Sequence, residues 1–248
     1  MEQTRPGTPA AHSLSDIKDW SKTIKLKSEV KREASMEIQK PDVGTSKKCS
    51  FTFTLNENVR KSDRSVFTAH GKHTESIYSA LKANDNFKER MQNHLNKNIL
   101  VYEEKTIDGY VNLGMPLKCL PRDSHFKITF GQRKCNQEDD QMFRQWSLVS
   151  GRHGKVSSDC VKFYIHAIGK SKKRIIKRGK LHKKGCKLCV YAFKGETIKD
   201  AVCKDGRFLS FLEKEDWKLI KNLDSILEST QTVDNLEGEL FEVEVEKR

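Results

Sequence analysis

GETIKDAVCKDGRF, residues 195–208, repeats in weaker form the earlier stretch HTESIYSALKANDNF, residues 73–87. Each copy has a glutamate, an isoleucine two residues later, an alanine followed by an aliphatic residue, a polar break and a phenylalanine. The shared residues are Glu75, Ile77, Ala80, Leu81 and Phe87 in the first copy and Glu196, Ile198, Ala201, Val202 and Phe208 in the second. Apolar residues at i, i+3 and i+4 predict the buried face of a helix. The chain therefore repeats one helix start, and we expect Thr74 to cap the first copy.

Short strands surround both helices in the same order. Alternating apolar and polar residues predict strands at 50–56 and 125–130 around the first helix and at 160–169 and 240–246 around the second. Further strands are expected at 65–72 and 98–104 in the first unit and at 187–193 and 217–220 in the second. Two strands, one helix and further strands are the order of the ubiquitin-like β-grasp fold, whose first and last strands lie together at the sheet centre. The alternative is two unrelated α+β domains that share a helix start by coincidence.

The predicted fold class is α+β, with two ubiquitin-like β-grasp domains in tandem after a disordered arm. Residues 1–47 form the arm, because they mix Lys, Ser, Thr, Glu and Pro with few large apolar residues. The first domain is expected at 48–133 and the second at 159–248. The polar stretch 134–158 is the linker between them.

The overall charge favours an anionic partner. The formal net charge is +13, and a basic surplus of this kind suits nucleic acid or an acidic surface, although solubility alone also explains it. The first residues have no apolar core, so we expect no secretory signal. The longest apolar run, Leu188–Phe193, is six residues, far short of the roughly 20 that a membrane helix needs. We therefore expect a soluble intracellular protein with no membrane partner.

Seven cysteines at irregular spacings are expected to be reduced thiols. Cys186 and Cys189, with His182 and Cys203, are soft ligands of the kind that hold zinc. A strand would point Cys186 and Cys189 to opposite faces, and no second matched pair exists. We expect neither a metal nor another cofactor.

KSKKRIIKRGKLHKKGCK, residues 170–187, holds ten basic and no acidic residues. We call it the basic strip and expect it to be a hairpin between the first two strands of the second domain. Uncompensated charges repel one another unless an anion accompanies them, and phosphates need such cations. A solvated loop, or a nuclear import signal at 172–174, is the alternative. The candidate nucleic-acid-binding residues are Lys170, Lys172, Lys173, Arg174, Lys177, Arg178, Lys180, Lys183, Lys184 and Lys187.

The end of the chain is acidic. Residues 213–248 hold eleven acidic and five basic residues, so part of the basic strip is expected to fold back onto this stretch. None of the eight histidines has the sequence context of a base beside a nucleophile. We therefore expect no enzyme activity and no small-molecule substrate.

Two longer stretches carry a family resemblance. They are VNLGMPLKCLP, residues 111–121, followed by DSHFKITFGQRK, residues 123–134, and the whole second unit from CVKFYIHAIG onward. Together they resemble the amino-terminal half of the proteins called family with sequence similarity 111. The first unit is more similar to paralogue B and the second to paralogue A. The resemblance covers most of residues 49–248 and implies ubiquitin-like folds in a family of nuclear trypsin-like serine proteases tied to chromatin, replication forks and removal of protein–DNA crosslinks.

Two features of that family are missing from these residues. The His and Ser contexts of its protease domain do not occur, and neither does the sliding-clamp box of paralogue A. The first hypothesis is therefore a non-catalytic targeting region that contacts DNA, single-stranded in preference, or chromatin through the basic strip. The second is a protein-interaction or dimerisation scaffold, and the third a truncated gene product. The expected location is the nucleus, with the cytoplasm as a second one.

Overall fold

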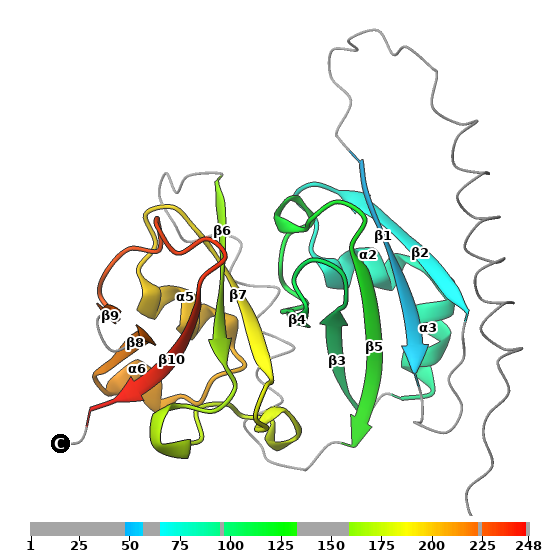
Figure 1. Ribbon diagram of the computed structural model, residues 1–248. Coiled ribbons are helices and arrows are strands. Elements are labelled where there is room, and N and C mark those ends of the chain that lie inside the picture. The colour runs from blue at the N-terminus through cyan, green and yellow to red at the C-terminus, as the bar shows by residue number, and fades with distance from the viewer. Residues whose placement is uncertain (1–47, 57–64, 95–96, 133–158, 223–224, 247–248) are drawn as a thin grey trace, which may run out of the picture. The chain divides into compact units, whose positions relative to one another are not determined.

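The computed structural model describes residues 48–56, 65–94, 97–132, 159–222 and 225–246. The expected arm, 1–47, and linker, 134–158, lie outside the described residues. The described part is a mixed α+β structure that is mostly strand with few helices (Figure 1). We refer to residues 48–132 as the first half and to residues 159–246 as the second half.

The first half is a five-stranded sheet with two short helices. Its elements are β1 (Lys48–Asn56), β2 (Val66–Lys72), α2 (Ile77–Ala83), α3 (Asp85–Gln92), β3 (Lys97–Glu103), β4 (Gly109–Tyr110), the 3-10 turn η1 (Leu117–Cys119) and β5 (His125–Gln132). The strand order is β2-β1-β5-β3-β4. Strands β1 and β5 are parallel neighbours, and the other pairs are antiparallel.

The second half repeats this arrangement. Its elements are β6 (Cys160–His166), the 3-10 turns η4 (Lys170–Lys172) and η5 (Gly179–Leu181), β7 (Lys187–Phe193), α5 (Ile198–Asp205), α6 (Phe211–Lys214), β8 (Trp217–Asn222), β9 (Ser225–Glu228) and β10 (Leu240–Val245). The order β7-β6-β10-β8-β9 has the same pattern as the first half, again with first and last strands parallel. The eight predicted strands are present, whereas the short β4 and β9 were missed.

The repeated glutamate makes the same hydrogen bond in both halves. The Glu75 carboxylate accepts the backbone N–H of Lys72 at 2.9 Å, and Glu196 accepts that of Phe193 at 3.4 Å. In each case the bond spans three residues, from the end of the second strand to the turn before the helix. The repeated glutamate therefore fixes the tight connection through which the strand enters the helix.

The first helix begins later than expected. Ser76, not Thr74, is its N-cap, and the Ser76 hydroxyl accepts the Ser79 backbone N–H at 3.1 Å. Thr197 caps the second helix in the same way, through the Asp200 N–H. The prediction of Thr74 was wrong because Glu75 is used by the turn and is not in the first helical turn. Asn84 also divides the first helix into α2 and α3, with φ −85° and ψ 126°.

Each half has its own apolar core between its helices and its sheet. In the first half Phe51, Phe53, Leu81, Phe87 and Phe126 are almost fully buried. The second half has an equivalent core, made by Phe163, Ile165, Ile198, Val202, Trp217 and Phe241. Burial of one such large side chain contributes about 1.5–3 kcal/mol.

The two halves meet along what we call the seam, the contacts between residues 48–132 and 159–246. Strands β4 and β7 pair there at Tyr110 and Leu188, which joins the two sheets. Strand β7 is apolar on both faces: Leu188 belongs to the second core, whereas Cys189 belongs to the first. Residues 46–248 accordingly form one compact unit.

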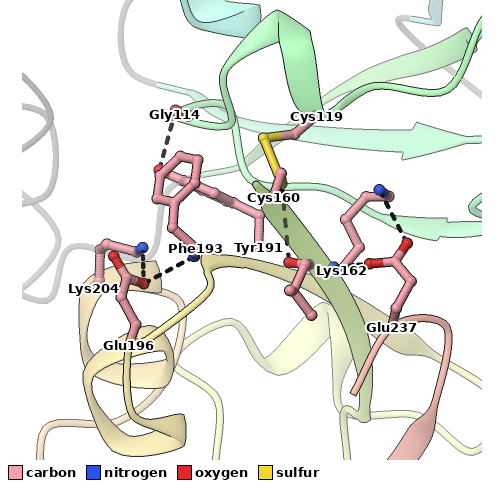
Figure 2. The surroundings of a disulfide bond; sticks show 10 residues. Gly114, Cys119, Cys160, Lys162, Tyr191, Phe193, Glu196, Lys204 and Glu237 are labelled. Atoms are coloured by element: carbon pink, nitrogen blue, oxygen red, sulfur yellow. Dashed lines mark hydrogen bonds and ion pairs between the residues drawn. A yellow bond between two sulfur atoms is a disulfide. The ribbon is translucent and has the colours of Figure 1, made fainter. Parts of the chain in front are cut away.

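A disulfide bond also crosses the seam, between Cys119 and Cys160 (Figure 2). The expectation of seven reduced thiols is therefore wrong for these two residues. Nothing in their spacing of 41 positions indicated the pairing. The fold creates it, because η1 and the start of β6 come together only when the halves pack.

Candidate nucleic-acid interface

The basic strip connects β6 to β7 but is not a simple hairpin. Its chain contains the turns η4 and η5, and isolated bridges tie Arg174 to Ile168 and Ile176 to Phe208. The apolar residues within it are buried in the second core: Ile175, Ile176 and Leu181 are each at most 2% exposed. The backbone of the basic strip is thus anchored, and only its cationic side chains project from the surface.

The tip of the basic strip has an unusual backbone. Ser171 and Lys172 have φ values of 58° and 60°, and the Lys173 N–H closes the turn on the Lys170 carbonyl at 3.2 Å. Two successive left-handed residues form the tight hairpin turn that Asn-Gly usually occupies. Non-glycine residues adopt this conformation only where their surroundings impose it. Here the bridge between Ile168 and Arg174 holds the two ends of the turn together.

Three lysines of the basic strip have acidic partners. Lys170 pairs with Glu244 at 2.8 Å, Lys173 with Glu215 at 3.6 Å, and Lys187 with Asp108 at 3.7 Å. The first two partners belong to the acidic end of the chain, so the predicted fold-back is confirmed. The third partner crosses the seam. Exposed pairs of this kind contribute at most about 1 kcal/mol each.

The two arginines of the basic strip are used by the fold. Arg174 donates from Nε to the Ile176 carbonyl at 3.1 Å and from Nη2 to the Lys177 carbonyl. Arg178 donates from Nη1 across the seam to the Ile99 carbonyl. Both guanidinium groups therefore donate to backbone carbonyls, which leaves fewer of their N–H groups to bind phosphate.

Five lysines remain, and we call them the open lysines: Lys172, Lys177, Lys180, Lys183 and Lys184. None takes part in an ion pair among the described residues. Lys177 is half-buried and the other four are exposed. Of the ten candidate residues, the structure thus singles out these five as cations without an acidic neighbour in the described chain.

One histidine does lie beside a hydroxyl. The Thr52 Oγ1 and His125 Nδ1 atoms are 2.8 Å apart on adjacent strands of the first half. The Glu104 carboxylate is 3.9 Å from His125 Nε2, beyond hydrogen-bond reach, so it does not orient the ring as a catalytic carboxylate does. Burial lowers the pKa of His125 below its usual value. This arrangement is that of a neutral histidine within a sheet, and it does not activate the Thr52 hydroxyl as a nucleophile.

The cysteines considered as metal ligands are dispersed. Cys186 lies just before β7, and Cys189 is fully buried within it. Burial raises the pKa of the Cys189 thiol to about 12, so it stays protonated. No group of three or more His, Cys, Asp or Glu side chains within the described ranges is arranged to hold a metal ion. In the same part of the chain, no helix has the length and apolar character to cross a bilayer.

Sequence reasoning missed a buried ion pair at the seam. Arg207, 7% exposed, pairs with Asp205 at 2.6 and 2.7 Å and donates to the carbonyls of Tyr110 at 2.9 Å and Cys189 at 2.6 Å. Asn112 donates to the Asp205 carbonyl. We call these residues the arginine clasp. The available signal was the polar break of the second repeat, which carries an acid and a base beside a buried phenylalanine.

Comparison with known proteins shows a family model and relatives to which the chain is similar. Residues 45–244 match the family model described as FAM111, N-terminal domain. The chain is 54% identical over 249 residues to human serine protease FAM111B, covering 100% of the chain and 33% of that relative. It is 44% identical over 195 residues to mouse serine protease FAM111A, covering 79% of the chain and 31% of that relative. The chain thus spans about a third of the length of the curated relatives that it matches.

Proposed function

The chain belongs to the FAM111 family, in the region of its N-terminal domain, and from this premise we propose that it is the non-catalytic targeting region of a chromatin-associated serine protease. The open lysines contact nucleic-acid phosphates without reading sequence. Replication and the removal of protein–DNA crosslinks are the processes that such a region serves, in the nucleus and secondarily in the cytoplasm. The chain's resemblance to serine proteases supports the first part of this proposal, and the lysines support the second.

We also propose that the two halves are ubiquitin-like β-grasp domains, at 48–133 and 159–248, with 134–158 as the linker after the arm 1–47. The shared strand order, β2-β1-β5-β3-β4 and β7-β6-β10-β8-β9, supports this assignment. So do the parallel central strands and the single helix start that enters each half through the same glutamate contact.

The observation that carries the nucleic-acid proposal is the set of open lysines on an anchored backbone. Three neighbouring lysines already have carboxylate partners, whereas the open lysines repel one another unless an anion lies among them. Phosphates on a flexible strand can pair with cations that project from an anchored backbone.

Half-buried aromatic rings lie beside the basic strip and support a preference for single strands. Lys173 Nζ is 5.0 Å from the centre of the Phe211 ring, and Lys187 Nζ is 5.0 Å from that of Tyr164. Bases released from a duplex stack on rings of this kind, and stacking tolerates any sequence. We therefore expect single-stranded DNA to bind more tightly than the duplex.

Neutralising the open lysines is expected to flatten the salt dependence of DNA binding. For a single strand, the slope of log K against log salt falls by roughly 0.7 for every phosphate that the protein no longer neutralises. The measurement is a fluorescence-anisotropy titration of the whole chain against labelled single-stranded DNA of two unrelated sequences, at several salt concentrations. The variant is K172Q/K177Q/K180Q/K183Q/K184Q.

The matched control removes the same charge elsewhere, in K48Q/K82Q/K105Q/K199Q/K214Q. These lysines lie outside the basic strip and in no ion pair of the described residues. We expect the control to bind more weakly than the wild type but more tightly, and with a steeper slope, than the open-lysine variant. Equal slopes in the two variants would mean that net charge, and not the basic strip, carries the binding.

A second candidate function is a self-association scaffold, favoured by the two ends of the joined sheet. Val66 on β2 and Ile226 on β9 are 59% and 50% exposed, and β2 and β9 are the terminal strands in the sheet order. Edge strands with exposed apolar residues pair readily with another chain. The outer face of β7 is already covered by the first half, so the edges remain for a partner.

Under this second candidate, the sedimentation coefficient should rise with protein concentration in the absence of nucleic acid. The V66K/I226K variant should abolish that rise, because lysine on an edge strand opposes pairing. Sedimentation velocity over a hundredfold concentration range makes the measurement, with T74K/T230K, at exposed turn positions outside both edge strands, as a control for the added charge. A single unchanging species in the wild type would remove the scaffold from consideration.

A further inference from the structure

The Cys119–Cys160 bond joins segments from the two halves (Figure 2). Cys119 is the last residue of η1, and Cys160 is the first residue of β6, with 5.7 Å between their Cα atoms. This separation lies within the range of about 4.4–6.8 Å that a disulfide requires. The bond therefore crosses the seam between elements that belong to different cores.

Non-covalent contacts between the loop around η1 and strand β7, the neighbour of β6, hold the two halves together beside the disulfide. The Tyr191 hydroxyl donates to the Gly114 carbonyl at 3.2 Å, and Lys118 Nζ lies 4.6 Å from the centre of the Phe193 ring. Within the second half, Lys204 Nζ lies 5.3 Å from the centre of that ring and pairs with Glu196 at 2.6 Å, which fixes the position of the ring. None of these contacts involves a sulfur atom, so the two thiols stay within reach of each other when the bond is broken.

The two sulfur-bearing residues differ in exposure. Cys119 is buried at 2% exposure, whereas Cys160 is only partly buried. Of the two residues, Cys160 is therefore the more accessible to a reagent from solvent. The other cysteines within the described ranges are single thiols, and burial raises the pKa of Cys49, Cys189 and Cys203.

We propose that Cys119 and Cys160 are a reversible redox-modification site that ties the two halves together when oxidised. The oxidant is hydrogen peroxide. The Cys160 thiolate attacks one peroxide oxygen, the O–O bond breaks, and Cys160 becomes a sulfenic acid while the departing hydroxide takes up the proton lost by the Cys160 thiol. The Cys119 thiolate then attacks the Cys160 sulfur and displaces hydroxide, which takes up the proton lost by the Cys119 thiol. In sum, two thiols and hydrogen peroxide give one disulfide and two molecules of water.

Reduction begins at the same sulfur. A small thiolate attacks the Cys160 sulfur, and Cys119 leaves as a thiolate that takes up a proton. A second small thiolate attacks the external sulfur of the mixed disulfide, so that Cys160 regains its thiol and the reductant leaves as its own disulfide. The chain then keeps the seam contacts but loses the covalent tie.

The expected effect is on stability. The bond closes a loop between positions 41 apart, which restricts the unfolded chain, so the oxidised form should melt on the order of 10 °C above the reduced form. The reason is the smaller entropy of the cross-linked unfolded chain, and the size of the shift falls if the reduced chain keeps structure when unfolded.

The test uses the whole chain in parallel samples treated with hydrogen peroxide or with dithiothreitol. After the peroxide or dithiothreitol is removed, the thiols are alkylated in denaturant, and peptides are mapped by mass spectrometry without further reduction. The peroxide sample should contain a Cys119 peptide linked to a Cys160 peptide, and the dithiothreitol sample should show both alkylated after unfolding. Melting curves of the two samples should differ for the wild type and for Cys203→Ser, but not for Cys119→Ser or Cys160→Ser.

Two results would overturn the proposal. One is the recovery of Cys119 and Cys160 as free, alkylatable thiols after peroxide treatment of a chain that circular dichroism shows to be folded. The other is a linked peptide that survives excess dithiothreitol on the folded chain, which would make the bond permanent. Peptide mapping of the wild type decides both, so the test does not depend on the serine variants folding.

Discussion

Replacing Arg207 with methionine is expected to destabilise the folded chain by about 3–5 kcal/mol, because it leaves the Asp205 carboxylate buried without its cation. Asp205 is 2% exposed, so water does not replace the two hydrogen bonds that the guanidinium donates. The carbonyls of Tyr110 and Cys189 lose their donor in the same step. Urea unfolding monitored by circular dichroism measures the change in the free energy of unfolding.

The double variant D205N/R207M separates charge from packing. Without the carboxylate no unpaired charge remains, so we expect the double variant to be more stable than R207M alone. Arg122→Met, at an exposed position of the first half, should change the stability by less than about 0.5 kcal/mol. If R207M also stayed within that margin, the arginine clasp would not contribute to holding the seam.

Replacing Glu103 with leucine is expected to cost about 2–4 kcal/mol, because its carboxylate is the acceptor for four backbone N–H groups. Glu103 is 0% exposed. Its two oxygens accept from residues 105, 106 and 107 at 2.6–3.1 Å and from His125 at 3.2 Å. Leucine would leave the N–H of Ile107, which is buried, without an acceptor. Thermal unfolding of the variant measures the effect.

Two controls bracket the Glu103 result. Glu103→Gln keeps one acceptor oxygen but turns an amide N–H₂ towards donors, so its cost should lie between zero and that of leucine. Glu104→Ala removes the neighbouring carboxylate, which pairs with Lys127 at the surface at 2.5 Å, and should cost less than about 1 kcal/mol. A Glu104 effect as large as that of Glu103 would contradict the role assigned to the buried carboxylate.

The elements of each half were predictable because their apolar residues are periodic. Phe51, Phe53 and Leu55 alternate on β1, and Ile198, Ala201 and Val202 follow the helical period on α5. Both patterns express burial against a single core, which is a local property of the sequence. Strand β4 escaped prediction because two residues are too few for a period to be seen, and β9 because its apolar residues, Ile226 and Leu227, are adjacent and do not alternate.

The seam was not predictable from pattern. On β7, Leu188, Cys189 and Val190 are all buried, and this short apolar run fits a buried strand without indicating what covers its second face. The arginine clasp and the disulfide likewise depend on residues far apart in sequence. Of the basic strip, its position and its contacts with the acidic end were predictable. Which lysines stay open was not, because that depends on where each carboxylate lies.

Both faces of β7 are buried, one by the second half and one by the first, so the second half depends on the first. A fragment that began at residue 159 would contain β7 without the first half. In the intact chain, Cys189, Tyr191 and Phe193 on one face of β7 pack against apolar residues of the first half. That fragment would expose an apolar surface to solvent and would tend to aggregate. The two similar halves are therefore not independent of each other, because the second half needs the first to cover one face of β7.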